Sequence, residues 1–169
     1  MDTSGLPLAK RADFQQLVHN HEVDLFTLRA GDLVTQITNF GGRIVNLFVP
    51  DRDGGPGNVT LGFNSIDEYL HANERYYGAI IGRYANRIAK GAFELEDQRF
   101  PLPRNDGPNH LHGGVIGFDS VVWEVNEVDE QSITLSHTSI DLEQGYPGRL
   151  EASVTYSISD DGSILIEYE

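Results

Sequence analysis

The chain has 169 residues, of which 39% are hydrophobic and 22% are charged, as is usual for a soluble globular domain. Its 26 acidic and 12 basic side chains give a formal charge of −14. This charge repels phosphate backbones and anionic lipids, so neither nucleic acid nor a membrane is expected as a partner. The absence of cysteine excludes disulfides, thiolate nucleophiles and cysteine-ligated zinc.

The first residues of the chain mix charged and apolar side chains. Residues 1–14 therefore lack the uninterrupted apolar core of a secretion signal, and no stretch of the sequence reaches the length of a membrane span. We expect a soluble, cytoplasmic protein. Residues 1–25 are expected to be a lead-in segment, either weakly ordered or added as an edge strand.

Alternation of apolar and polar side chains predicts strands along most of the remaining chain. In chain order, the predicted strands cover residues 33–38, 43–49, 59–63, 93–95, 121–125, 133–136, 150–158 and 164–168. One short helix is expected, because Ser65 followed by Glu68 matches a capping box. Many short strands separated by glycine-rich and proline-rich turns favour an all-β fold, an antiparallel sandwich or barrel.

The last two predicted strands form a hairpin around a turn that ends in Gly162. The strand at residues 164–168 is followed by no turn or polar tail in the given sequence, and its ladder groups need a partner. We therefore expect residues 26–169 to be part of a single sandwich domain that is truncated at its C-terminus, or a domain whose last strand pairs with another chain.

Two glycine-flanked runs, residues 82–88 and 109–114, carry the strongest functional signal. They contain Asn86, Arg87 and His112, which supply an amide, a guanidinium and an imidazole. These groups offer hydrogen-bond donors and acceptors in fixed directions, and the glycines let the backbone approach a ligand closely. The combination predicts a sugar site, although a surface ion pair is the alternative for Arg87 and a turn histidine bonded to backbone is the alternative for His112.

The sequence contains six histidines, the natural candidates for proton transfer near neutral pH. His110 and His112 are two residues apart, so on an extended backbone both would point to the same face. A metal site is disfavoured there, because the next acidic residue is Asp119. The other histidines are expected to be solvated, to cap the short helix or to pack beside a strand: His19, His21, His71 and His137.

Two classes of chemistry have no specific support in the sequence. No pair of carboxylates can be selected by spacing, as a glycosidase would need. Gly113 and Gly114 lack the lysine and hydroxyl residue of a phosphate-binding loop.

Several motifs occur together in an order and at spacings that resemble the aldose 1-epimerase family, also called galactose mutarotases. They are residues 77–88, residues 109–114, residues 117–119 with Trp123, and residues 145–148. The resemblance runs from about Phe26 to the end of the chain. It implies a large antiparallel β-sandwich of the galactose-mutarotase-like supersandwich type, present here as roughly its N-terminal half.

The resemblance also implies an enzyme that interconverts the α and β anomers of hexoses such as galactose and glucose, without a metal or organic cofactor. Asn86 and Arg87 match the sugar-contacting pair of the family. His112 matches the first active-site histidine, which helps to hold and polarise the bound sugar, so we expect it to be both catalytic and substrate-binding. No role is carried onto His110.

In the family, a carboxylate base removes the proton of the anomeric hydroxyl while a histidine acid protonates the ring oxygen. The resemblance implies that this second histidine and the glutamate base lie beyond residue 169, so we expect the chain alone to be inactive. Two other functions stay open: a non-catalytic carbohydrate-binding sandwich, and a relative acting on sugar phosphates. The second would need a cluster of cationic residues, which the 12 basic residues do not obviously form.

Overall fold

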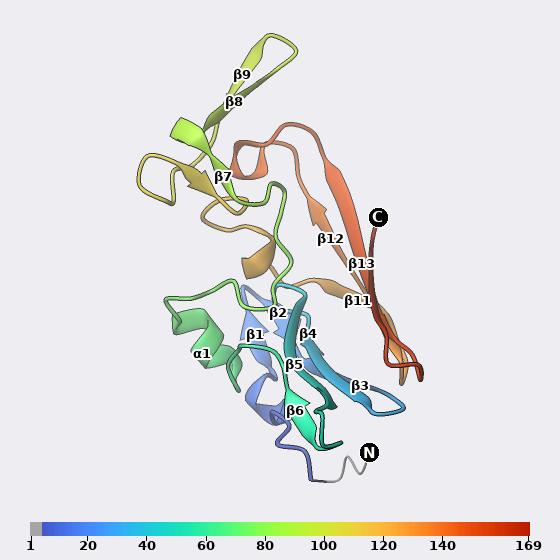
Figure 1. The fold of residues 1–169 in the computed structure, drawn as a ribbon. Helices are drawn as coiled ribbons and strands as arrows, with labels where there is room; N and C mark the ends of the chain where they lie inside the picture. The colour runs from blue at the N-terminus through green and yellow to red at the C-terminus, as the bar shows by residue number, and fades with distance from the viewer. Residues whose placement is uncertain (1–4) are drawn as a thin grey trace.

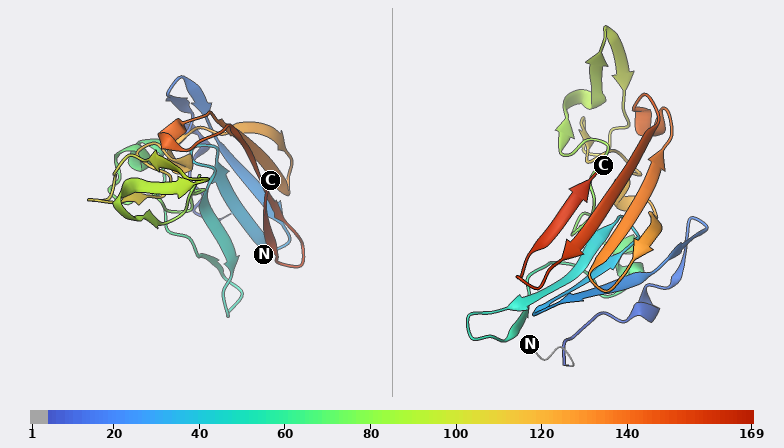
Figure 2. Two further views of the ribbon diagram at one scale, coloured as in Figure 1. Left: turned by 90° about the horizontal axis from the view of Figure 1, so that it is seen from above. Right: turned by 90° about the vertical axis from the view of Figure 1, so that its right-hand side faces the viewer.

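The computed structural model describes residues 5–169 and consists mainly of antiparallel strands. Two four-stranded sheets face each other (Figures 1 and 2). The first contains, in spatial order, β3 (Leu25–Ala30), β4 (Leu33–Thr38), β5 (Arg43–Pro50) and β6 (Pro56–Asn58). The second contains β11 (Glu124–Val128), β12 (Ser132–Ser139), β13 (Leu150–Ile158) and β14 (Ile164–Tyr168). The predicted antiparallel sandwich is confirmed.

Shorter elements surround the two sheets. The remaining strands pair as β1 (Gln16–Val18) with β2 (His21–Val23), β8 (Ala92–Leu95) with β9 (Gln98–Pro101), and β7 (Arg87–Ile88) with β10 (His110–Leu111). Helix α1 spans Ile66–His71, and short 3-10 turns lie at Arg11–Asp13, Ala89–Gly91, Phe118–Ser120 and Glu143–Gly145. Strands β7, β8 and β9 form a lobe above the sheets in Figure 1. No helix within residues 5–169 is long and apolar enough to cross a membrane.

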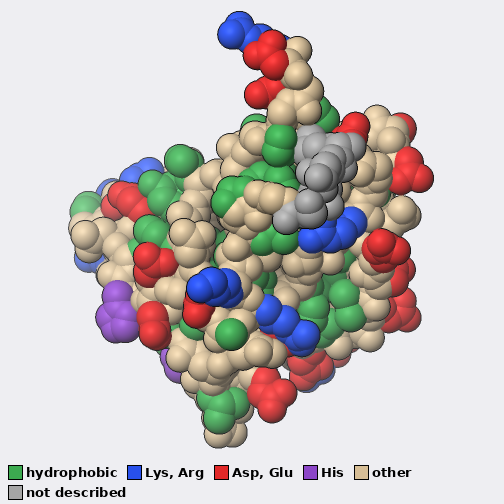
Figure 3. Space-filling view, turned by 90° about the horizontal axis from the view of Figure 1, so that it is seen from below, with side chains coloured by type: hydrophobic (Ala, Val, Ile, Leu, Met, Phe, Trp, Pro, Cys, Tyr) green, Lys and Arg blue, Asp and Glu red, His purple; other side chains and the backbone are tan. Residues whose placement is uncertain are grey.

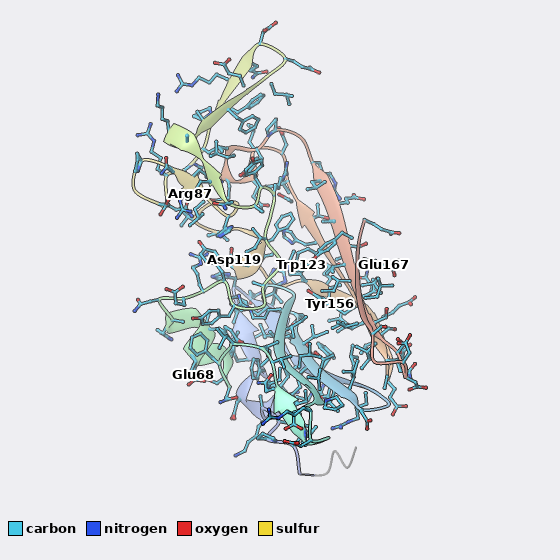
Figure 4. All side chains as sticks on the ribbon, viewed as in Figure 1. Glu68, Arg87, Asp119, Trp123, Tyr156 and Glu167 are labelled. Atoms are coloured by element: carbon cyan, nitrogen blue, oxygen red, sulfur yellow. The ribbon has the colours of Figure 1, made fainter. Side chains whose placement is uncertain are left out.

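A hydrophobic core fills the space between the two sheets. Its fully buried members include Leu28, Ile37, Ile133, Leu135 and Val154. Figure 4 shows Trp123 and Tyr156 in this layer, and the Tyr156 hydroxyl donates to the carbonyl of Gly42 at 2.5 Å. Burying an aliphatic side chain contributes about 1.5–3 kcal/mol, so this layer is the main source of stability for the sandwich.

A second core covers the opposite face of the first sheet, beneath α1 and the β1–β2 hairpin. Phe14 and Val18 are buried in it. The backbone of Ala9 is fixed by Gln36, whose side-chain oxygen accepts from the Ala9 N–H at 2.9 Å and whose amide donates to the Ala9 carbonyl at 3.0 Å. The described part of the expected lead-in therefore packs against the sheet through Ala9, Phe14 and Val18, and its last residue, Leu25, is the first residue of β3.

Most predicted strands are present, with two exceptions. Strands β4, β13 and β14 have the predicted bounds. The strand predicted at residues 59–63 is wrong, because the chain leaves the sheet after β6 and the Phe63 N–H donates to the Tyr69 hydroxyl of α1 at 3.1 Å. The strand predicted at residues 121–125 begins at Glu124 instead. Residues 121–123 cross to the first sheet, where the Trp123 N–H donates to the Asn39 carbonyl at 2.8 Å.

The helix start predicted from Ser65 and Glu68 is confirmed, with one difference from a capping box: the Glu68 carboxylate bonds to the N–H of the residue before the cap. The Ser65 hydroxyl accepts from the Glu68 N–H at 3.3 Å, and the Glu68 carboxylate accepts from the Asn64 N–H at 2.9 Å. At the other end, Nδ1 of His71 lies 2.8 Å from the Asp67 carbonyl, as expected for a capping histidine. The bond from Glu68 to Ser65 satisfies one of the N–H groups that the first turn of a helix leaves unpaired.

Strand β14 lies at the edge of the second sheet, where it pairs with β13 (Figure 2). Leu165 and Tyr168 on β14 are 53% and 64% exposed. One side of the strand therefore presents its ladder groups to solvent. Acidic side chains are scattered over the face shown in Figure 3, in keeping with the charge of −14.

Candidate functional site

Strands β7 and β10 bring the three predicted site residues together in the lobe above the sheets. Leu111 lies opposite Arg87 in the strand pair. Just beyond this pair, the His112 N–H donates to the Asn86 carbonyl at 3.1 Å, and the Asn86 N–H donates to Nδ1 of His112 at 3.0 Å. The three predicted site residues therefore lie side by side, and Figure 4 shows Arg87 in the lobe above the sheets.

The bond from Asn86 fixes the protonation pattern of the His112 ring. A backbone N–H can only donate, so Nδ1 must carry a lone pair, and the proton of the neutral ring is on Nε2. The His112 side chain is only partly buried. Its Nε2–H is thus a directed donor that a ligand can reach.

Arg87 is held by a neighbouring carboxylate. Its Nε donates to Oδ2 of Asp106 at 2.7 Å, and its Nη1 donates to the side-chain oxygen of Asn86 at 3.3 Å. The hydrogen bond from Arg87 lowers the pKa of Asp106. Arg87 is therefore ion-paired, as the surface alternative predicted. More than half of its side chain is also exposed, so its outer face is open to a ligand, as the sugar-site alternative needs.

Two residues of the trio formed by Asn86, Arg87 and His112 have left-handed backbone. Asn86 and His112 have positive φ angles of 66° and 51°, a conformation that asparagine and histidine adopt more often than most other non-glycine residues. Gly113, with φ of 87°, packs against Gly82 so closely that a Cβ would collide with its carbonyl oxygen. Only glycine can place the His112 loop against the segment that leads to Asn86.

Asn105 clamps the loop that carries His112. Its side-chain oxygen accepts from the Leu111 N–H at 2.7 Å, and its amide donates to the carbonyls of Leu111 at 2.9 Å and Gly114 at 2.8 Å. We did not predict this role. The available signal was the turn that Asn105 begins with Asp106 and Gly107, because asparagine in turns commonly bonds to nearby backbone.

The expectation that His110 and His112 point to the same face is wrong. The positive φ of His112 ends the extended backbone on which that expectation depends. His110 is fully buried: its Nδ1 donates to the Pro103 carbonyl at 2.7 Å, and its Nε2 accepts from the Tyr146 hydroxyl at 2.7 Å. Both nitrogens are used, so His110 supports the fold beneath the site. Burial raises the pKa of Tyr146 to about 12, which keeps its hydroxyl protonated.

Tyr76 is a neighbour of His112 that the sequence did not reveal. The two ring centroids are 4.6 Å apart and the ring planes are tilted by 60°. Tyr76 precedes the motif at residues 77–88 by one position, and nothing in its local sequence distinguishes it from a packing residue.

The other histidines lie away from the trio. His19 and His21 are exposed at the β1–β2 hairpin. His137 packs against Phe118 and Trp123, and burial lowers its pKa. Among residues 5–169, no group of three or more histidine or acidic side chains is placed to hold a metal ion.

The fold and the trio define a class of β-sandwich protein that carries a partly exposed polar site at one end of its sheets. The profile of the aldose 1-epimerase family matches residues 24–169, and the chain belongs to this family.

Two curated relatives and one solved structure support this assignment. The galactose mutarotase of Sus scrofa is 44% identical over 146 residues, which cover 86% of this chain and 42% of that protein. The aldose 1-epimerase of Haemophilus influenzae is 44% identical over 133 residues, or 79% of this chain and 38% of that protein. The GalM/aldose epimerase homologue from C. elegans superposes with a TM-score of 0.82 at 28% identity, covering 86% of this chain and 45% of that one. The chain thus spans less than half the length of these relatives.

Proposed function

We propose that this chain provides one wall of the sugar site of an aldose 1-epimerase that interconverts the α and β anomers of hexoses such as galactose and glucose. Membership of the family and the names of the relatives support the reaction class. The observation that carries the proposal is the bond from the Asn86 N–H to Nδ1 of His112, because it leaves Nε2–H free as a directed donor. Asn86 and Arg87 lie beside that donor.

Mutarotation needs two proton transfers on neutral groups: the anomeric hydroxyl loses a proton and the ring oxygen gains one. We assign His112 a supporting part in this reaction. Its Nε2–H donates a hydrogen bond to a sugar oxygen at the anomeric end, which stabilises charge that develops there as the ring opens. Nδ1 is already occupied by the Asn86 N–H, so His112 acts as a donor and the proton-accepting base is a different residue.

Arg87 and Asn86 bind the sugar hydroxyls in this proposal. The guanidinium and the amide supply several donors and one acceptor at fixed angles, which suits adjacent hydroxyls. Asp106 orients the guanidinium through its 2.7 Å bond to Nε. The second histidine and the glutamate base of the family are assigned to residues outside these 169, so we expect the chain alone to bind sugar without turning it over.

Optical rotation tests the assignment. Freshly dissolved α-galactose should relax at the buffer rate in the presence of the chain alone. Relaxation should accelerate when the chain is fused to the part of the Sus scrofa enzyme that lies beyond the aligned residues. A fusion that folds and binds galactose without catalysis would favour a non-catalytic carbohydrate-binding module.

We also propose that β14 pairs with a further strand, from the rest of a longer sandwich or from a second copy. The exposed Leu165 and Tyr168 on this edge strand support the proposal. Size-exclusion chromatography tests it. We expect the chain to self-associate, and we expect the C-terminal part of the Sus scrofa enzyme to suppress this when it is added. A chain that stays monomeric at every concentration and does not bind that part would refute the proposal.

A further inference from the structure

We propose that Tyr76 is a positioning residue that sets the plane of the His112 ring for the sugar, and that Arg75 and Asp119 hold Tyr76 in place. The inference rests on the proposed function and extends it to residues outside the sugar-contacting trio. The bond from the Asn86 N–H holds one atom of the His112 ring, but the ring can still tilt, and tilting bends and weakens that bond.

The ring of Tyr76 restricts that tilt. Its centroid lies 4.6 Å from the centroid of His112, with the planes tilted by 60°. Tilted aromatic contacts at this distance are favourable and directional. Tyr76 is half-buried, and burial raises its pKa, so the phenol stays neutral beside the imidazole. Together, the bond at Nδ1 and the contact with Tyr76 define the direction of Nε2–H.

Arg75 connects Tyr76 to a buried carboxylate. The Arg75 guanidinium carbon lies 5.5 Å from the centroid of the Tyr76 ring. Its Nε donates to Oδ2 of Asp119 at 2.9 Å, and its Nη2 donates to the Val115 carbonyl at 3.0 Å and to the Ser120 hydroxyl. Asp119 is fully buried, and Figure 4 shows it where the upper lobe meets the sheets.

A second arginine fixes the backbone of the same residues. Arg43 is 1% exposed and lies within the first sheet. Its Nη1 donates to the Arg75 carbonyl at 3.1 Å, and its Nη2 donates to the Asp119 carbonyl at 2.5 Å. The segment that carries Tyr76 is therefore tied to the sandwich through both its backbone and the Arg75 side chain. These bonds hold the segment in a fixed position against the sheet. A hydrogen-bond donor that binds a sugar needs such a fixed position.

The imidazole of His112 reports directly on this role. In the ligand-free 169-residue chain, nitrogen-15 NMR of the histidine rings gives the ratio of the two neutral tautomers, and His112→Gln identifies the signals of His112. The Nε2–H tautomer should dominate in the unaltered chain and in Tyr76→Phe, which keeps the ring. It should lose its dominance in Tyr76→Leu, which keeps apolar volume but removes the flat aromatic face, because a ring that tilts weakens the bond from the Asn86 N–H that selects this tautomer. Tyr84→Leu is the matched control, because Tyr84 is a more exposed tyrosine of the same segment.

Galactose titration of the same samples adds the functional readout. Tyr76→Leu should weaken binding about tenfold, as expected for a displaced hydrogen-bond donor, while Tyr76→Phe and Tyr84→Leu bind as the unaltered chain does. If Tyr76→Leu fails to fold, Arg75→Lys replaces it, since lysine keeps a charge beside Asp119 but loses the planar group over Tyr76. A shift of the His112 tautomers in that variant supports the inference.

Different results would overturn the role of Tyr76 and the proposed sugar site. Unchanged His112 tautomers and unchanged galactose affinity in Tyr76→Leu would overturn the role of Tyr76 while leaving the sugar site standing. Absence of galactose binding in every form would instead refute the sugar site, and the ligand-free tautomer ratio would still decide whether Tyr76 orients His112.

Discussion

Asn86 and His112 are 26 residues apart in the sequence, yet each donates a backbone N–H to the other, Asn86 to an imidazole nitrogen at 3.0 Å and His112 to a carbonyl at 3.1 Å. The pair closes the end of the β7–β10 ladder. Because one of the two acceptors is a side chain, the same contact that ends the ladder also selects the tautomer of the histidine. The two bonds between Asn86 and His112 therefore determine both the local backbone structure and the tautomer of the site histidine.

His112→Ala should remove the donor at the anomeric end and leave the sandwich folded. In the fusion described above, turnover should fall by about 10²- to 10⁴-fold, as for loss of a positioned proton-transfer or donor group. The thermal midpoint should change little, because His112 is only partly buried. Optical rotation and a thermal scan measure the two effects. An unfolded variant would show that His112 is needed for the structure instead.

Arg87→Ala should chiefly weaken sugar binding. Hydrogen bonds from a charged donor contribute about 1.5–3 kcal/mol, which corresponds to at least tenfold in affinity for galactose. Asp106→Asn is the matched control: it keeps a side-chain acceptor near Nε and removes the charge, so its effect should be smaller. Unchanged affinity in Arg87→Ala, measured by calorimetric titration, would remove Arg87 from the site.

The Arg87–Asp106 pair predicts a specific pH response. The pKa of Asp106 lies below its ordinary value of 3.8, mainly because of the hydrogen bond from Arg87. The contribution of this pair is therefore complete above pH 3.8 and is lost as the pH falls through the lower folded pKa. A carbon-13 NMR titration of the Asp106 carboxyl should show the lowered pKa in the unaltered chain and a higher pKa in Arg87→Ala. Equal values in the two chains would show that the ion pair does not form in solution.

Asn105→Ala should destabilise the loop that carries His112. The change removes the side-chain partner of the Leu111 N–H and of the Gly114 carbonyl, while the Leu111 carbonyl keeps its bond from the Gly114 N–H. Each unsatisfied buried group costs about 1–3 kcal/mol, so the free energy of unfolding should fall measurably in a urea titration. Hydrogen exchange at Leu111 should accelerate more than at β13. Asn105→Asp, which keeps the acceptor for the Leu111 N–H, should retain part of the stability; equal stability of all three chains would contradict the clamp.

The sequence predicted the sandwich well because burial on one face imposes a period of two. β4, β13 and β14 could be located to the residue for this reason. The same pattern failed at residues 59–63, where Val59 and Leu61 are exposed and Phe63 packs against Tyr69 of α1. Alternation of residue types did not distinguish this exposed loop from a strand with one buried face.

The candidate site was predicted only in part. Asn86, Arg87 and His112 were found because functional groups and glycines occur together in two short runs. The supporting residues were not found, since Asn105 and Tyr76 act on His112 through contacts that only the folded chain creates. The expectation that His110 and His112 share a face was wrong because the extended backbone on which it depends ends at His112, whose φ is positive at 51°.

The central claim is that a hexose binds against the guanidinium of Arg87, the amide of Asn86 and the imidazole of His112. A crystal of the chain soaked in galactose measures this most directly. We predict a sugar oxygen within hydrogen-bonding distance of Nε2 of His112 and sugar hydroxyls on Asn86 and Arg87. Galactose bound elsewhere, with these three side chains facing open solvent, would contradict the account.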